Sequence, residues 1–212
     1  LNVDVPAMNF GMLLQRSTQF GLFEIPLGLI GLTDPLDVIL GLGLINELWV
    51  KGEPAGYVRH VTGLVDEPLP GTNPKRILMT VAWLDKQVSN QASETLARSF
   101  GIPSLDASVQ HGLQGIPDRA GPLDSALVIY DAGSFDLFDP AHQPFIPPLA
   151  NLIPSSKCDP HARRLTIPAS IEQMLTFLQP DGRVENFCDG LCDAGSAFER
   201  PNGQEEVCDP LQ

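Results

Sequence analysis

Cysteine is absent from the first 157 residues of this 212-residue chain, and basic residues are scarce throughout. Lys and Arg number 13 against 26 Asp and Glu, so the formal net charge is −13 at pH 7. A surface of this sign repels the phosphate backbone of nucleic acids and the headgroups of anionic lipids. The composition therefore argues against nucleic acid as a partner and against docking on anionic lipid.

Long apolar runs are missing as well. No uninterrupted run reaches the roughly 18 residues that a membrane-spanning helix needs. Residues 20–50 come nearest, but acids and prolines interrupt them: Glu24, Pro26, Asp34, Pro35, Asp37 and Glu47. No transmembrane segment is therefore expected. With 43% hydrophobic and 18% charged residues, the chain has the composition of one globular domain with a sizeable core.

A signal peptide is also lacking, and the sequence opens without Met on Leu1-Asn2-Val3-Asp4-Val5, a pattern typical of a β-strand. This opening predicts a processed or truncated chain. The four cysteines all lie in the last quarter: Cys158, Cys188, Cys192 and Cys208. An even number in a loop-rich tail favours disulfides and a secreted or periplasmic protein over reduced structural cysteines. Zinc fits poorly because only His142 and His161 lie near the cysteines, so no metal or cofactor is expected.

Apolar runs at three places predict the strands of a parallel sheet: residues 1–5, 77–84 and 125–130. Helical patterns lie between and after these runs. Alternating strands and helices predict an α/β fold, with helices on the faces of the sheet. In such sheets the functional residues gather at the carboxyl ends of the strands.

Three helices are expected. The first has Asp34 as its N-cap and Pro35 at its first position, followed by apolar residues at helical spacing: Leu36, Ile39, Leu40, Leu44 and Leu48. It lies in residues 10–50, which are rich in Leu, Ile and Gly and low in charge. The helical region 10–65 fits a lid over an apolar pocket; a buried helix is the alternative. The second has Asn90 as N-cap, Gly101 as C-cap, and an apolar face of Ala92, Leu96 and Phe100. The third has Thr166 as its cap, Pro168 in its first turn, and an apolar stripe of Ile171, Met174, Leu175 and Leu178.

Two residues that could carry chemistry follow the two later strands. Asp85 comes directly after the strand 77–84, and His161 lies in the long loop that leaves the strand 125–130. A hydroxyl nucleophile needs a base to take its proton, and the base needs a buried acid to fix its tautomer. Asp85 and His161 are the candidate acid and base. The reserve candidates are Asp131 for the acid, and His111 and His142 for the base.

Two segments around these residues match a known family. Asp85-x-x-Val88-x-Asn90, between an apolar strand and a helix, resembles the acid-bearing turn of α/β-hydrolases. Asp159-Pro160-His161-Ala162-Arg163, before an amphipathic helix, resembles their histidine loop. Glu53-Pro54-Ala55-Gly56-Tyr57 and Cys188-Asp189-Gly190-Leu191-Cys192 are similar to segments of large secreted bacterial lipase-like hydrolases. The resemblance covers about residues 1–192.

This resemblance implies the C-terminal half of an α/β-hydrolase, with Asp85 as triad acid and His161 as base in the family's chain order of Ser, Asp and His. Residues 1–182 would belong to the hydrolase domain, with the lid-like region 10–65, and residues 183–212 would form a Cys-containing tail. The implied activity is hydrolysis of an apolar carboxylic ester, as in lipases and esterases. The alternative is a non-catalytic binding or assembly protein of the same fold.

The sequence departs from the family at the nucleophile. Gly-x-Ser-x-Gly occurs nowhere, and Ser134, in Ala132-Gly133-Ser134-Phe135-Asp136, lacks the second glycine and follows the wrong strand. We therefore expect an N-terminal portion of the same hydrolase as a partner that carries the serine and the oxyanion hole. Two disulfides are also expected, with the pairs Cys188–Cys192 and Cys158–Cys208 favoured over the two other connectivities.

Overall fold

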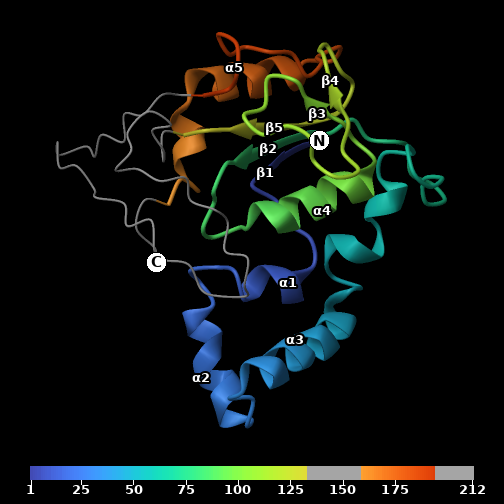
Figure 1. Cartoon of the computed structure of the whole chain (residues 1–212). Helices are drawn as coiled ribbons and strands as arrows, with labels where there is room; N and C mark the ends of the chain where they lie inside the picture. The colour runs from blue at the N-terminus through green and yellow to red at the C-terminus, as the bar shows by residue number, and fades with distance from the viewer. Residues whose placement is uncertain (133–158, 194–212) are drawn as a thin grey trace, which may run out of the picture.

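The computed structural model describes residues 1–132 and 159–193. Within these ranges the strands are β1 (Asn2–Asp4), β2 (Leu78–Ala82), β3 (Ser104–Leu105), β4 (Asp118–Arg119) and β5 (Ala126–Tyr130). They form one sheet in the order β1-β2-β5-β3-β4, and every named pair is parallel. Helix α5 (Pro168–Phe177) covers one face of the sheet and α4 (Asn90–Phe100) the other (Figure 1). The α/β fold expected from the sequence is therefore confirmed.

The centre of the sheet is the pair β2 and β5, in register from Leu78 opposite Ala126 to Ala82 opposite Tyr130. Every residue of both strands is buried. Alternate side chains enter two separate apolar clusters, one against α4 and one against α5. Burial on both faces explains why the two strands are nearly continuous apolar runs and do not alternate with polar residues.

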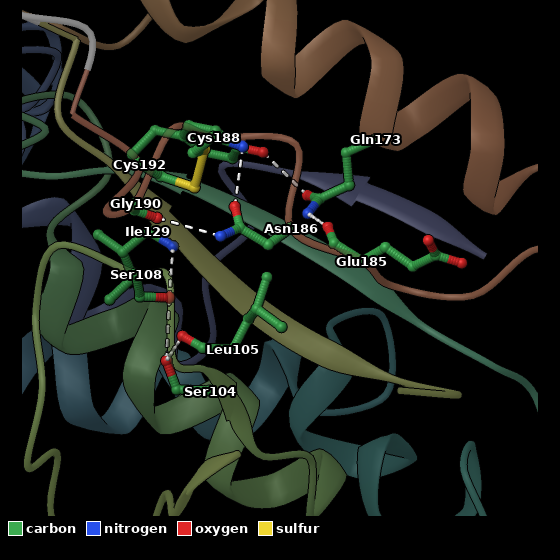
Figure 2. Close-up of a disulfide and its surroundings, with 11 residues drawn as sticks. Ser104, Leu105, Ser108, Ile129, Gln173, Glu185, Asn186, Cys188, Gly190 and Cys192 are labelled. Carbon is green, nitrogen blue, oxygen red and sulfur yellow. Dashed lines mark hydrogen bonds between the residues drawn. A yellow bond between two sulfur atoms is a disulfide. The ribbon is translucent and has the colours of Figure 1, made fainter. Parts of the chain in front are cut away.

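The short strands β3 and β4 were not expected from the sequence. Each has two residues, too few to leave an apolar period. Buried hydroxyl groups connect this region to the sheet: Ser104 Oγ donates to Ser108 Oγ at 3.1 Å, which accepts from the Ile129 backbone N–H at 3.1 Å (Figure 2). Side-chain hydrogen bonds thus supplement a short backbone ladder.

Helices α1 (Phe10–Leu14), α2 (Gly21–Leu29) and α3 (Pro35–Trp49) lie away from the sheet, below α4 in Figure 1. Asp34 caps α3 as predicted, since its Oδ1 accepts from the Leu36 N–H at 2.9 Å. The apolar residues expected at helical spacing on α3 are all exposed, and the buried residues are Leu42 and Asn46. The alternative of a buried helix is therefore wrong for these side chains.

Helix α4 begins one residue earlier than predicted. Its N-cap is Ser89, so the prediction that Asn90 caps it is wrong; the Asn90 side chain bonds to the preceding turn instead. The other end is as expected, because Gly101 ends the helix at φ 72°, a left-handed conformation that suits glycine. The predicted apolar face is buried: Ala92, Leu96 and Phe100.

Helix α5 differs from the prediction in its cap and in its buried face. Ile167 occupies the N-cap position, and the Thr166 hydroxyl donates to the Arg163 carbonyl. Three residues of the predicted apolar stripe are exposed, namely Ile171, Leu175 and Leu178; the buried residues are Ser170, Gln173 and Phe177. The Gln173 amide explains this orientation, since it accepts from the Tyr130 hydroxyl at 3.0 Å and donates to the Glu185 carbonyl at 2.6 Å.

A disulfide joins Cys188 to Cys192 in the segment after α5 (Figure 2), with a Cα–Cα distance of 5.1 Å. The Cys192 backbone accepts from the Asp131 N–H at 2.9 Å and donates to the Ala107 carbonyl at 2.6 Å. The disulfide loop therefore lies against the carboxyl end of β5. The expected pair Cys158–Cys208 lies outside the described residues, as do Ser134 and His142. No described helix is both long enough and apolar enough to cross a membrane.

Three single-turn helices complete the described secondary structure. They are η1 (Pro54–Gly56), η2 (Val58–His60) and η3 (Arg163–Thr166). The last of these follows directly on the loop that carries His161.

Candidate functional site

The site is built on a tight turn at the carboxyl end of β2. Leu84 in this turn has φ 62°, an uncommon conformation for a residue with a side chain. Asn90 holds the turn by two hydrogen bonds: its Oδ1 accepts from the Leu84 N–H and its Nδ2 donates to the Ala82 carbonyl, both at 2.7 Å. Strain of this kind costs of order 1–3 kcal/mol and persists where the surroundings fix it. The clamp of Asn90 thus fixes the direction in which the next residue points.

That next residue is Asp85, whose side chain is fully buried. Its Oδ1 accepts from the backbone N–H groups of Gln87 and Val88, both at 2.8 Å. Its Oδ2 lies 2.8 Å from Nδ1 of His161. A buried carboxylate is costly unless it is paired or hydrogen-bonded. The two backbone N–H groups and the ring nitrogen of His161 provide these hydrogen bonds, and together they fix the orientation of the carboxylate.

His161 reaches Asp85 from the loop that precedes α5. Its side chain is 25% exposed, and its Nδ1 contacts the buried acid. Because an ionised carboxylate only accepts hydrogen bonds, the short contact requires the proton on Nδ1. In the neutral ring the lone pair is then on Nε2. This is the tautomer in which an imidazole acts as a base toward a hydroxyl group.

A second carboxylate, that of Asp159, joins the two segments that carry the pair. Its Oδ1 accepts from the backbone N–H of Lys86 at 3.2 Å and from that of His161 at 3.1 Å. Its Oδ2 accepts from Nε2 of Gln87 at 2.9 Å. Asp159 therefore contacts the acid turn and the histidine loop at once and holds them together.

The structure thus brings together Asp85 and His161, which the sequence singled out, and adds Asn90, Asp159 and Gln87, which it did not. The sequence signal for Asp159 is its place before Pro160, since an Asp side chain in a turn often accepts from the backbone two residues on. The signal for Asn90, an amide side chain just before a helix, is the same as that of a helix cap. The catalytic roles of Asp85 and His161 remain predictions.

Two of the three reserve candidates lie elsewhere in the described part of the chain, and His142 lies outside it. Asp131 is buried at the end of β5, where its backbone pairs with the disulfide loop. His111 is largely exposed, with Nδ1 at 3.7 Å from Asp118 Oδ2. The histidine in contact with Asp85 is His161.

Comparison with protein-family models, with curated proteins and with solved structures found no match to this chain.

Proposed function

We propose that this chain supplies the acid and the base of a serine ester hydrolase of the α/β-hydrolase type, with Asp85 as acid and His161 as base. The observation that carries the proposal is the 2.8 Å contact between His161 Nδ1 and the buried Oδ2 of Asp85. Their placement supports it, because the two residues follow adjacent parallel strands, β2 and β5, in the chain order of acid before histidine.

The chemistry follows from the tautomer. Nε2 of His161 takes the proton of a serine hydroxyl as that oxygen attacks the ester carbonyl, and later gives the proton to the leaving alkoxide. Asp85 keeps the ring oriented and stabilises the imidazolium while it exists. The acyl group is then transferred to water by the same base.

The nucleophile is assigned to a partner, an N-terminal portion of the same hydrolase, because the 212 residues contain no Gly-x-Ser-x-Gly. That portion would also supply the donors of the oxyanion hole. The sheet is compatible with such an addition. In the described part of the chain β1 is an edge strand with half-buried residues, and an unpaired edge is where another strand can add.

Apolar side chains favour a water-insoluble ester as substrate. Large apolar residues of α2, α3 and the segment between them are exposed to solvent: Leu22, Phe23, Ile25, Leu29, Ile30, Leu36, Ile39, Leu40, Leu44 and Leu48. Extended apolar patches of this kind mark interaction sites. A lid-like role for residues 10–65 and a secreted or periplasmic location, for which the disulfide is a weak sign, belong to this proposal.

A second candidate, a non-catalytic binding or assembly protein of the same fold, is favoured by the lack of a nucleophile motif in this chain. Hydrolysis of nitrophenyl esters by the native preparation separates the two. Under the proposal, His161→Ala abolishes turnover while His111→Ala leaves it unchanged. Activity that survives His161→Ala, or a preparation with no esterase activity, would reject the assignment.

A further inference from the structure

A polar cavity of about 440 Å³, open to solvent, lies between α1, α3 and the first turn of α4. Its volume falls in the range of small-molecule sites. Neither Asp85 nor His161 lines it, so the cavity is separate from the pair described above and is independent of the proposed function. The residues that matter for its chemistry are Gln15, Arg16, Gly43, Asn46 and Glu47.

Arg16 brings a positive charge to the cavity, and Glu47, the acid that lines the same cavity, does not pair with it. Among the described residues no carboxylate pairs with it, and its guanidinium makes one hydrogen bond, a long contact of 3.5 Å from Nη1 to the Met12 carbonyl. Its Nε is buried and has no partner in that part of the chain. Burial lowers the pKa of the Arg16 guanidinium from its ordinary value, although an arginine stays protonated in proteins. The chain has twice as many acidic as basic residues, so an arginine without an acidic partner is unusual in it. A bound anion would stabilise the partly buried charge of Arg16.

Two amide side chains line the same space. Gln15 is 7% exposed, and within the described residues its side-chain amide has no hydrogen-bond partner. Asn46 is 6% exposed, and its Oδ1 accepts from the Gly11 N–H at 3.0 Å. That bond fixes the Asn46 side chain and leaves its NH₂ group as a donor. Both amides belong to residues that line the cavity, and their NH₂ groups have no partner among the described residues, so they can donate to a polar ligand.

Gly43 lies in the interior of α3 and lines the cavity. Glycine in a helix interior is unfavourable relative to alanine. A Cβ at Gly43 would meet no atom within 4 Å, so no neighbouring described atom requires the glycine. The space that its missing side chain leaves is part of the cavity.

We infer that this cavity binds a small molecule with one carboxylate, held by the guanidinium of Arg16 and by the amides of Gln15 and Asn46. The planar guanidinium matches a carboxylate through two parallel hydrogen bonds. Glu47, an exposed residue of the same cavity, disfavours a second negative charge on the ligand. A monocarboxylate is therefore preferred over a dicarboxylate or inorganic phosphate.

The test is to titrate small-molecule probes into the full chain and to measure their binding by nuclear magnetic resonance or calorimetry. The probes are hexanoate, its neutral analogue hexanamide, glutarate and inorganic phosphate. We expect saturable binding of hexanoate with a Kd of about 1 mM or below, and binding of the three other probes weaker by about tenfold or more. Arg16→Gln should weaken hexanoate binding by about tenfold to a hundredfold, the loss expected for a charged hydrogen-bonded partner.

The matched control is Arg59→Gln, which removes a surface arginine that pairs with Asp66 at 2.7 Å and should leave hexanoate binding unchanged. Gly43→Leu, which fills the cavity from α3, should abolish hexanoate binding in a chain whose circular dichroism is native. If Arg16→Gln does not fold, this second variant tests the inference in its place. Equal binding of hexanoate and hexanamide, unchanged binding in Gly43→Leu, or no saturable binding of hexanoate would overturn the inference.

Discussion

The two oxygens of the Asp85 carboxylate have different roles. Oδ1 is held by two backbone N–H groups, and Oδ2 faces the ring of His161. In Asp85→Asn the amide oxygen can keep the two backbone bonds, while the NH₂ group faces Nδ1 and forces the other tautomer of the ring. We expect kcat of the active preparation to fall by about 10⁴-fold, as for the corresponding change in a serine protease. The melting temperature should stay close to that of the wild type. If Asp85→Asn kept a near-normal kcat and Asp131→Asn lost it, the acid would be Asp131, which follows β5, and not Asp85.

Asp159 should act through position and not through contact with substrate. Asp159→Ala removes two hydrogen bonds between the acid turn and the histidine loop, and a third within the histidine loop. We expect kcat to fall by about tenfold to a hundredfold with KM nearly constant, since small displacements of catalytic groups are this costly. Asp159→Asn keeps one acceptor oxygen for the two backbone N–H groups and should restore most of kcat.

The control for Asp159 is Asp124→Ala, because Asp124 is an exposed acid whose partner is Arg183 at 3.3 Å. It should leave both kinetic constants unchanged. If Asp159→Ala changed KM and left kcat at the wild-type value, Asp159 would not position the base.

Glu94 gives a prediction about pH. Burial raises the pKa of Glu94 from its ordinary value, with Arg98 acting in the opposite direction. A pKa raised in the folded state means that the stabilising contribution is present at low pH and is lost as the pH rises through the folded value. Glu94→Gln should therefore melt at a higher temperature than the wild type at pH 7, and the difference should vanish below about pH 4. An equal difference at both pH values would show that charge is not its cause.

At the residue scale the sequence indicated the candidate acid and base, but not the residues that hold them in place. Asp85 and His161 could be chosen because strand ends in parallel sheets are predictable positions. Asn90 and Asp159 could not be assigned, because their roles depend on which backbone groups a turn brings within reach. A side-chain amide before a helix has the same sequence signal whether it caps the helix or clamps the preceding turn.

At the scale of single elements, α3 offers a matched pair of glycines. A Cβ at Gly43 would meet no atom within 4 Å, whereas one at Gly41 would lie 2.5 Å from Leu32 Cδ1. Gly43→Ala should therefore stabilise the fold by about 0.5–1 kcal/mol, the helix-interior difference between the two residues. Gly41→Ala should gain less or lose stability. Urea denaturation measures both, and an equal gain at the two positions would contradict the packing described around α3.

Helices and strands with a long sequence pattern could be predicted, and those with a short pattern could not. The strands β2 and β5 were found because long apolar runs flanked by turn residues mark buried strands. The two-residue strands β3 and β4 have no such pattern. Helix α5 was located, but its buried face was not, because hydrogen bonds of the Gln173 amide and not apolar spacing orient that helix. Tertiary polar contacts of this kind are invisible in one sequence.

At the scale of the whole molecule, the exposed apolar surface of α2 and α3 is the feature that most needs a function. Leu40→Ser combined with Leu44→Ser should raise KM for long-chain esters and leave KM for an acetyl ester unchanged. The stability should change by less than about 0.5 kcal/mol per site, because both side chains are already exposed. Equal changes of KM for the two esters would show that α2 and α3 do not bind the acyl chain of the substrate.

The central claim is that Asp85 and His161 activate a serine carried by another polypeptide. The most direct measurement is labelling of the native preparation with a fluorophosphonate, followed by separation under denaturing conditions. We expect label on a polypeptide other than this 212-residue chain, and loss of that label in His161→Ala. Label on this chain would contradict it and would direct attention to an unconventional nucleophile such as Ser134, and label that persists in His161→Ala would show that His161 is not the base.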